Sequence, residues 1–165
     1  MSTPKTNLFN FNTSTNSSSW QIINDGVMGG VSKSTLQITN DGHGLFSGHV
    51  SLANNGGFAS IRHQPNFKDL DQFTHVILKL KGDQKNYQFR LKASTQQRQS
   101  YVQEFKTNGK WQEIELKISD FYPQFRGQQL DMSNFNFNEI QEMAFLIANK
   151  KEEDFSLLID QIMLR

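Results

Sequence analysis

The sequence predicts an all-β fold, an antiparallel β-sandwich of the jelly-roll type. Two observations support this prediction. Apolar and polar residues alternate along several segments, which is typical of half-buried antiparallel strands because successive side chains point to opposite faces. Turn-forming residues also separate these segments at short intervals, as in sandwiches and jelly rolls. Helical periodicity is scarce.

The alternation is clearest in three segments: HVILKLK at 75–81, NYQFRLK at 86–92 and WQEIELKIS at 111–119. In the second segment, Gln88, Arg90 and Lys92 lie on the face opposite the apolar residues. Further strands are expected at 35–39, 44–52, 57–63, 100–106, 142–148 and 155–164. The last two contain MAFLIA and FSLLIDQIML, which are nearly continuously apolar, so we expect them to be central strands.

Glycine-containing turns separate the expected strands at 40–42, 54–57, 82–83 and 108–109. Single helical turns are expected within 65–73 and 131–143. With 165 residues, the chain is expected to form one domain over 20–165. Residues 1–19 are rich in Ser, Thr and Asn and are expected to be a flexible lead-in, with LFNF docking on the body.

The composition excludes several classes of function. The 17 Lys and Arg residues nearly balance the 16 Asp and Glu residues, so no global field attracts nucleic acid or an anionic membrane. Without cysteine there is no disulfide, thiolate nucleophile or cysteine-based metal site. The sequence contains neither an apolar run long enough to cross a membrane nor a secretory signal. We therefore expect a cytoplasmic location without direct membrane insertion.

The stretch NDGVMGG, residues 24–30, resembles a phosphate-binding loop but has the wrong spacing. Its glycines match neither the dinucleotide fingerprint nor the P-loop, and a strand-like segment follows where a helix is needed. The four histidines show no metal-ligand spacing, and Ser47 lies in a strand rather than a nucleophile elbow. No cofactor, metal or catalytic group is therefore expected, and the glycines are interpreted as turn residues or as a surface that a partner approaches closely.

Two further features raise the question of buried charge and of binding. Asp160 lies within LLIDQIML, where a lone carboxylate is costly, and Arg62, Arg90 and Arg126 are its candidate partners. The segment FYPQFRGQQL brings aromatic residues, including Phe125, next to Arg126. This composition fits both a binding patch for protein or sugar and a loop clamped over the edge of the sandwich.

Several motifs follow one another in the order of a known family. They are WxxxNDGVMGGVS, FSGxVSLANNGGFASIR, YxFRL, FxxFRG and FLIAxK, which extend from about Trp20 to Ile162. Together they resemble the complex I intermediate-associated protein 30 family, assembly factors of NADH:ubiquinone oxidoreductase. The resemblance implies a galactose-binding-like β-sandwich, which agrees with the fold derived from the alternation. It also implies a non-enzymatic role in holding partly built complexes with other proteins.

The first 19 residues contain one Lys and no Arg, which differs from a mitochondrial transit peptide, so a bacterial-type single-domain member is expected. The leading hypothesis is a protein-binding module that aids assembly or stability of a respiratory or other membrane-associated complex, to which it is peripheral through its partner. The hypothetical binding surface contains Asp25, Met28, Asn54, Asn55, Arg62, Arg90, Phe125 and Arg126.

Within this surface, a polar cluster of Asp25, Asn54, Asn55 and Arg126 beside Met28 is expected at one rim of the sandwich. The alternative function is a carbohydrate-binding module, in which Trp20, Tyr101, Trp111 or Tyr122 stacks on a sugar face.

Overall fold

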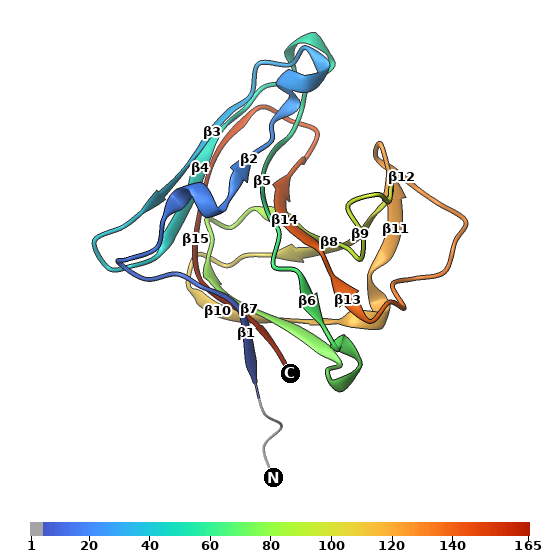
Figure 1. Ribbon diagram of the computed structural model, residues 1–165. Helices are drawn as coiled ribbons and strands as arrows, with labels where there is room; N and C mark the ends of the chain where they lie inside the picture. The colour runs from blue at the N-terminus through green and yellow to red at the C-terminus, as the bar shows by residue number, and fades with distance from the viewer. Residues whose placement is uncertain (1–4) are drawn as a thin grey trace.

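The computed structural model describes residues 5–165, except for the side chains of Val27 and Met28. The predicted all-β sandwich is confirmed: two antiparallel sheets face each other, and a small third sheet lies at one end (Figure 1). The strands are β1 (Thr6–Asn10), β2 (Gln21–Ile22), β3 (Lys33–Ile38), β4 (Gly44–Val50), β5 (Ala59–His63), β6 (Phe67–Lys68), β7 (His75–Lys81), β8 (Asn86–Lys92), β9 (Ser100–Lys106), β10 (Trp111–Lys117), β11 (Tyr122–Phe125), β12 (Gln128–Gln129), β13 (Glu139–Ile140), β14 (Glu142–Ile147) and β15 (Glu153–Leu164).

We call the two large sheets sheet A and sheet B. Sheet A has six strands in the order β10-β7-β15-β4-β3, with β1 also paired to β15. Sheet B has seven strands in the order β12-β11-β9-β8-β14-β5-β2, and β13 pairs with β6 separately. The expected strands at 75–81, 86–92 and 100–106 coincide with β7, β8 and β9. As expected, β14 and β15 lie inside their sheets, each with a neighbour on both sides.

Five short 3-10 turns connect the strands: η1 (Ser17–Ser19), η2 (Asp25–Met28), η3 (Ala53–Asn55), η4 (Leu70–Gln72) and η5 (Ile118–Asp120). The helical turn expected within 65–73 is η4. The one expected within 131–143 is absent from that described segment, because its end forms β13 and pairs with β6 instead. None of these turns has the length and apolar character needed to cross a bilayer, within the part of the chain described.

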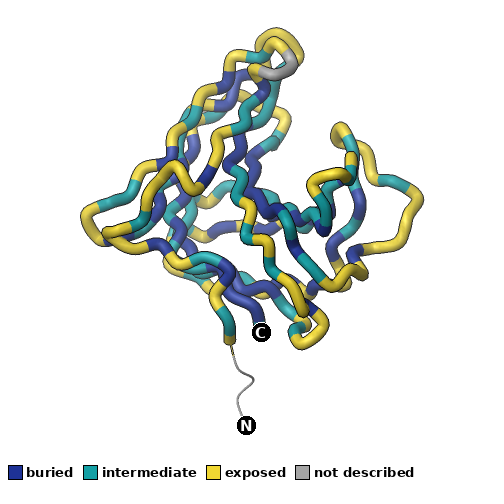
Figure 2. Tube along the Cα trace, in the orientation of Figure 1, coloured by how far each residue is buried: buried dark blue, intermediate teal, exposed yellow. Residues whose placement is uncertain are grey.

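The core lies between the sheets and is rich in phenylalanine. In Figure 2 the buried residues follow the strands, and the exposed ones follow the connections. Phe89 and Phe145, on neighbouring strands of sheet B, have ring centroids 5.0 Å apart, and Phe46 and Phe155 on sheet A are 4.8 Å apart. All four side chains are at most 4% exposed. Burial of these rings, together with the aliphatic core residues around them, stabilises a chain that has no disulfide.

The segment before Trp20 contributes to this core, which corrects the flexible lead-in expected over residues 1–19 for the described residues 5–19. Strand β1 pairs with β15, and the Phe11 amide donates to the Asp160 carbonyl oxygen at 2.9 Å. Phe11 and Trp20 are 3% and 4% exposed, with ring centroids 5.9 Å apart. LFNF docks because three of its side chains, Leu8, Phe9 and Phe11, pack in or against the core, while its backbone pairs with β15.

Candidate functional site

The Asp25 carboxylate joins the two glycine-rich loops that the sequence singles out. The side chain is fully buried in η2, the turn that follows β2. Its Oδ2 accepts hydrogen bonds from the Gly57 amide at 2.7 Å and from the Ser32 hydroxyl at 2.5 Å, and its Oδ1 accepts one from the Ser32 amide at 2.9 Å. The Phe58 amide adds a longer bond of 3.4 Å. Residues 24–30 and 54–58 therefore adjoin, as the shared-rim hypothesis requires.

This carboxylate remains ionised because of its hydrogen bonds. Burial by itself raises the pKa of Asp25, but the bonds from the Ser32 hydroxyl and from the amides of Gly57, Ser32 and Phe58 outweigh it and hold the pKa below the usual 3.8. Ser32 extends the network, since its hydroxyl oxygen also accepts from the Ser51 amide at 2.9 Å. Both carboxylate oxygens of Asp25 thus have hydrogen-bond partners inside the fold. We call this residue a staple, because its hydrogen bonds hold the two loops together.

Two glycines are required next to this staple. A Cβ atom added to Gly30 or Gly56 would overlap the Asp25 side chain, whereas one added to Gly26 meets nothing within 4 Å. Part of the glycine pattern in residues 24–30 and 54–58 is therefore explained by close packing around one carboxylate. Asn54 and Asn55 are exposed and adopt φ of 57° and 61°, a left-handed conformation that asparagine tolerates well.

The remaining candidates lie elsewhere. The side chain of Met28 lies outside the described residues. Arg126 is exposed in the turn between β11 and β12, where its guanidinium carbon lies 5.2 Å from the centroid of the Phe125 ring. Arg98 covers the same ring at 5.3 Å. Figure 1 shows this hairpin standing across the open side of sheet B from the loops that hold Asp25 and Asn54. The single polar cluster that the sequence suggested is therefore divided between two opposite rims.

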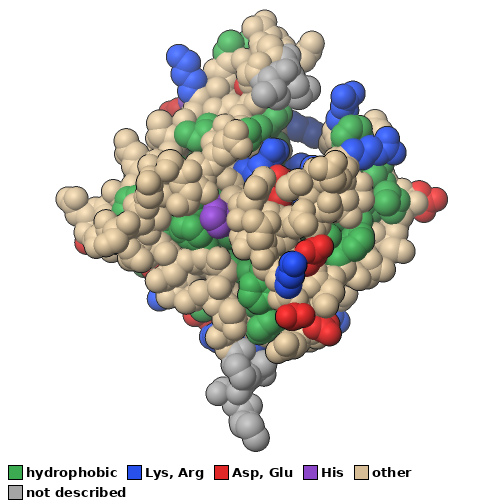
Figure 3. Space-filling model, in the orientation of Figure 1, with side chains coloured by type: hydrophobic (Ala, Val, Ile, Leu, Met, Phe, Trp, Pro, Cys, Tyr) green, Lys and Arg blue, Asp and Glu red, His purple; other side chains and the backbone are tan. Residues whose placement is uncertain are grey.

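Between these rims lies the outer face of sheet B, which we call the sheet B face. Figure 3 shows it as a hollow with Lys and Arg side chains on its floor and on the hairpin rim. In the register of the sheet, Ala144 of β14 pairs with Arg62 of β5 on one side and with Arg90 of β8 on the other. The two arginines are therefore aligned across the three strands and lie on the same face. Two residues further along these strands, Lys92 of β8 pairs with Glu142 of β14.

Arg90 is held by neutral partners. Its Nε and Nη2 donate to Gln88 Oε1 at 3.0 and 2.8 Å, and Nη2 also donates to Gln124 Oε1 at 2.6 Å. Within residues 5–165, no carboxylate oxygen lies within 4.0 Å of its guanidinium nitrogens. The pKa of Arg90 is lowered to about 10, mainly because the group is buried; Tyr122 opposes this decrease and the Arg62 charge adds to it. Arg90 is nevertheless charged at neutral pH.

The neighbouring cations share one close carboxylate. Arg62 Nε lies 3.4 Å from Glu142 Oε2, whose side chain is 9% exposed. Lys92 Nζ donates to the Gln97 carbonyl oxygen at 2.9 Å. Burial lowers the pKa of Lys92, Glu142 raises it, and Arg62 and Arg90 lower it. The sheet B face thus carries a partly desolvated cationic group in which positive charges repel one another.

Sequence reasoning identified Arg62 and Arg90 but missed Lys92, Glu142 and Gln124 as part of the same surface. The alternation in 86–92 already places Lys92 beside Arg90. No comparable signal existed for Glu142, because β14 is buried on both faces and the rest of the strand is apolar. Gln124 reaches Arg90 across β9, a contact between strands that the sequence does not disclose.

Asp160 has different partners from the arginines suggested by the sequence. It lies at an irregularity of β15, between Ile159 and Gln161, on sheet A. Its carboxylate oxygens are 3.5 Å from Lys79 Nζ and 3.6 Å from His43 Nε2. The three arginines belong to sheet B and its hairpin, so they are on the wrong sheet to reach it.

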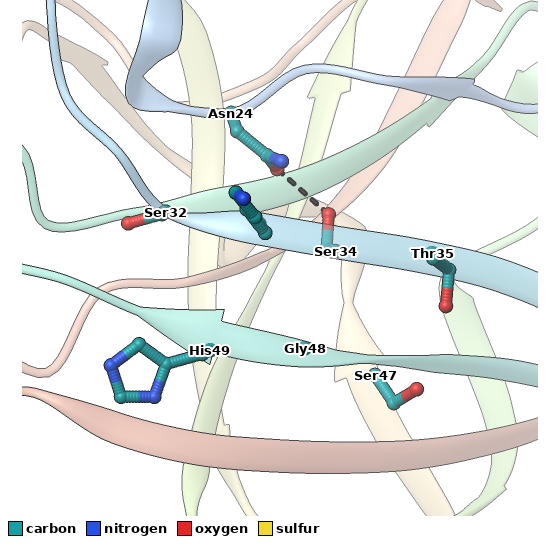
Figure 4. A pocket seen from close by; sticks show the side chains of 8 residues that line it. Asn24, Ser32, Ser34, Thr35, Ser47, Gly48 and His49 are labelled. Carbon is teal, nitrogen blue, oxygen red and sulfur yellow. Dashed lines mark hydrogen bonds between the residues drawn. The ribbon is translucent and has the colours of Figure 1, made fainter.

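A second hollow, a groove of about 580 Å³, lies over β3 and β4. Figure 4 shows Asn24 above it, with the Ser34 hydroxyl donating to Asn24 Oδ1 at 2.8 Å. The rest of its lining consists mainly of short hydroxyl side chains, and it includes no aromatic ring apart from His49. His49 Nδ1 lies 2.8 Å from Asp154 Oδ1. Among the described side chains, no group of three His, Cys, Asp or Glu is arranged to hold a metal ion here or elsewhere.

Solved structures with similar folds include carbohydrate-binding modules and agarases. The family 11 carbohydrate-binding module of a cellulosomal cellulase from Clostridium thermocellum superposes with a TM-score of 0.69 and 16% identity, covering 99% of this chain and 95% of that one. A family 29 carbohydrate-binding module gives 0.57 and 9% identity, covering 98% and 91%. An exo-β-agarase gives 0.60 and 14% identity, covering 96% of this chain and 24% of that one. At these identities the similarity establishes the fold alone.

No curated protein matches the chain. Residues 9–159, however, match the family described as Complex I intermediate-associated protein 30. The match includes both loops joined by Asp25 and every strand of sheet B. The chain therefore belongs to the complex I intermediate-associated protein 30 family.

Proposed function

We propose that this protein is a non-enzymatic protein-binding module that aids assembly or stability of a respiratory complex, or of another membrane-associated complex, and that it docks its partner on the sheet B face. Family membership supports the role in assembly. The observation that carries the docking site is Arg90, a largely buried cation in an open hollow, whose hydrogen-bond partners among the described residues are the neutral amides of Gln88 and Gln124. Burying a cation without a counter-charge costs stability, so its presence is more easily explained by a partner.

The test is affinity purification from the native host. The chain, tagged and expressed at its natural level, is cross-linked in cells, and co-purifying proteins are quantified against a strain that expresses the tag alone. We expect enrichment of respiratory-chain subunits or their assembly partners, and a lower level of assembled complex I on native gels when the gene is deleted. Normal complex I in the deletion strain, together with no enrichment of these subunits, would refute the proposal.

The alternative is a carbohydrate-binding module, which the similar folds of such modules favour. Two of the four aromatic residues expected to stack on a sugar are unavailable, since Trp20 is 4% exposed and Tyr101 is 2% exposed. Trp111 is 41% exposed at the edge of sheet A, where it packs on His43, and Tyr122 is half-buried on the sheet B face. Calorimetry with soluble β-glucans tests this alternative, and saturable heat that disappears in Tyr122→Ala would establish it.

A further inference from the structure

We propose that the partner segment received by the sheet B face is acidic, and that a carboxylate of that segment binds at Arg90. This inference rests on the proposed function, because it specifies the chemistry of the partner at the same site. Charge distribution is the first argument for it. The chain as a whole has a formal charge of +1. In contrast, the sheet B face carries four cations, Arg62, Arg90, Lys92 and Lys106, against two carboxylates, Glu104 and Glu142.

The rim strengthens this asymmetry. Arg98 and Arg126 flank Phe125 on the hairpin side, and neither forms an ion pair within the described residues. The face and its hairpin rim therefore hold a surplus of four positive charges on a nearly neutral chain. Such segregation attracts an oppositely charged partner and orients it, and it selects against basic partners.

The second argument is the state of the Arg90 head group. Its Nε and Nη2 are occupied by amide oxygens, while Nη1 forms no hydrogen bond to the described residues. Gln88 and Gln124 fix the plane of the guanidinium without neutralising it, so its orientation is set before a ligand arrives. A carboxylate is an acceptor that matches a fixed guanidinium, because the pair forms charge-assisted hydrogen bonds.

A third argument comes from the space around it. Ala144 separates Arg62 from Arg90 on the sheet, and the strands on either side place their Cα atoms roughly 10 Å apart. The side chain at this central position is only a methyl group, so it projects less far from the sheet than the two arginines that flank it. Nucleic acid fits less well, because it requires many phosphate contacts and exposed rings for stacking, and the Phe125 ring is already covered by two arginines.

The experiment measures binding of a fluorescein-labelled deca-glutamate peptide to the full chain by fluorescence anisotropy, at low and at physiological salt. Deca-lysine and a neutral Gly-Ser peptide of equal length are the comparison ligands. We expect saturable binding of the acidic peptide only, weakening as salt increases. Arg90→Gln is expected to weaken it about tenfold or more, and Arg62→Gln by a smaller factor. Lys117→Gln removes an exposed cation from sheet A and is expected to change the affinity less than about twofold.

Circular dichroism melts first establish that each variant is folded, and Arg62→Gln, at a side chain that is 37% exposed, provides a second variant if Arg90→Gln is not. The inference is overturned if the acidic peptide does not saturate, or if Lys117→Gln weakens binding as much as Arg90→Gln. It is also overturned if a single-stranded RNA or vesicles containing anionic lipid bind more tightly with the same dependence on Arg90, since these outcomes assign the face to another class of partner.

The outcomes for the two proposals are separable. If respiratory subunits co-purify equally with the wild-type chain and with Arg90→Gln, the proposed function stands, and the inference that an acidic segment binds at Arg90 is wrong. If the acidic peptide binds through Arg90 but the native host yields no respiratory subunit, the inference of an acidic partner segment stands, and the role in respiratory assembly is wrong.

Discussion

Asp25 is the residue on which the arrangement of the two glycine-rich loops depends. Its carboxylate accepts from three backbone amides and one hydroxyl, and these donors come from residues 32, 57 and 58. Hydrogen bonds to a charged acceptor are about twice as strong as neutral ones, and a buried donor left without a partner is costly. One side chain thus fixes the relative position of segments more than thirty residues apart in sequence.

Replacing this carboxylate is expected to destabilise the fold. Asp25→Asn keeps the shape but places an amide group against backbone donors, so the free energy of unfolding should fall by about 3 kcal/mol. Urea denaturation followed by tryptophan fluorescence measures this change. Asp41→Asn, at an exposed turn position, is the matched control and should change it by less than about 0.5 kcal/mol. Equal effects of the two substitutions would contradict the role of Asp25 as a staple.

The same residue predicts part of the pH dependence. Because the pKa of Asp25 in the fold lies below 3.8, its contribution to stability is complete above that value and is lost as the pH falls through the folded pKa. The difference in free energy of unfolding between wild type and Asp25→Asn should therefore be constant near neutral pH and shrink below about pH 3.8. Urea denaturation at a series of pH values checks this, and a difference that stays unchanged at acidic pH would show that Asp25 is not responsible.

Turn η2 and the loop at 56–58 form a unit packed around that carboxylate. Gly30→Ala introduces a Cβ into the space of the Asp25 side chain and should destabilise the protein by about 1–3 kcal/mol, as overpacking does. Gly26→Ala, inside η2 itself, adds a Cβ that meets nothing within 4 Å among the described residues and should be nearly neutral. Thermal melts of the two variants provide the comparison. A Gly26→Ala variant as unstable as Gly30→Ala would mean that the turn tolerates no side chain at all, for a reason other than Asp25.

Elements with a local signal could be predicted accurately from the sequence. Strands β7 and β8 coincide with the ranges expected from alternation, because alternation within a single strand indicates which face is buried, and β9 coincides with the further strand expected at 100–106. The pairing of β14 between β8 and β5 could not be predicted, since it joins segments far apart in the chain. For the same reason the sequence grouped Arg126 with Asp25, although the order of strands in sheet B puts them on opposite rims. Arg62 and Arg90 were named, but their common position beside Ala144 depends on register.

The packed body as a whole extends to β1, well before Trp20. Phe11 contacts the core and lies under the ring of Trp20, so Phe11→Ala should lower the free energy of unfolding by about 3–5 kcal/mol. Phe137→Ala removes the same side chain at a position that is 39% exposed and should cost clearly less. Urea denaturation of the full chain measures both. A Phe11→Ala variant as stable as wild type would restore the interpretation of this segment as a dispensable lead-in.

The order of strands in sheet A has a consequence for how the protein is made. Strand β15 lies between β4 and β7, whose paired residues precede it by roughly 80 to 115 positions, and it also pairs with β1. On a translating ribosome, both neighbours therefore remain as open edges until residue 164 has left the exit tunnel. Sheet B can close earlier, because the strand that joins β5 to β8, β14, ends at Ile147. We expect the nascent chain to display two unpaired edges late in synthesis, the stage at which a general chaperone is most useful to it.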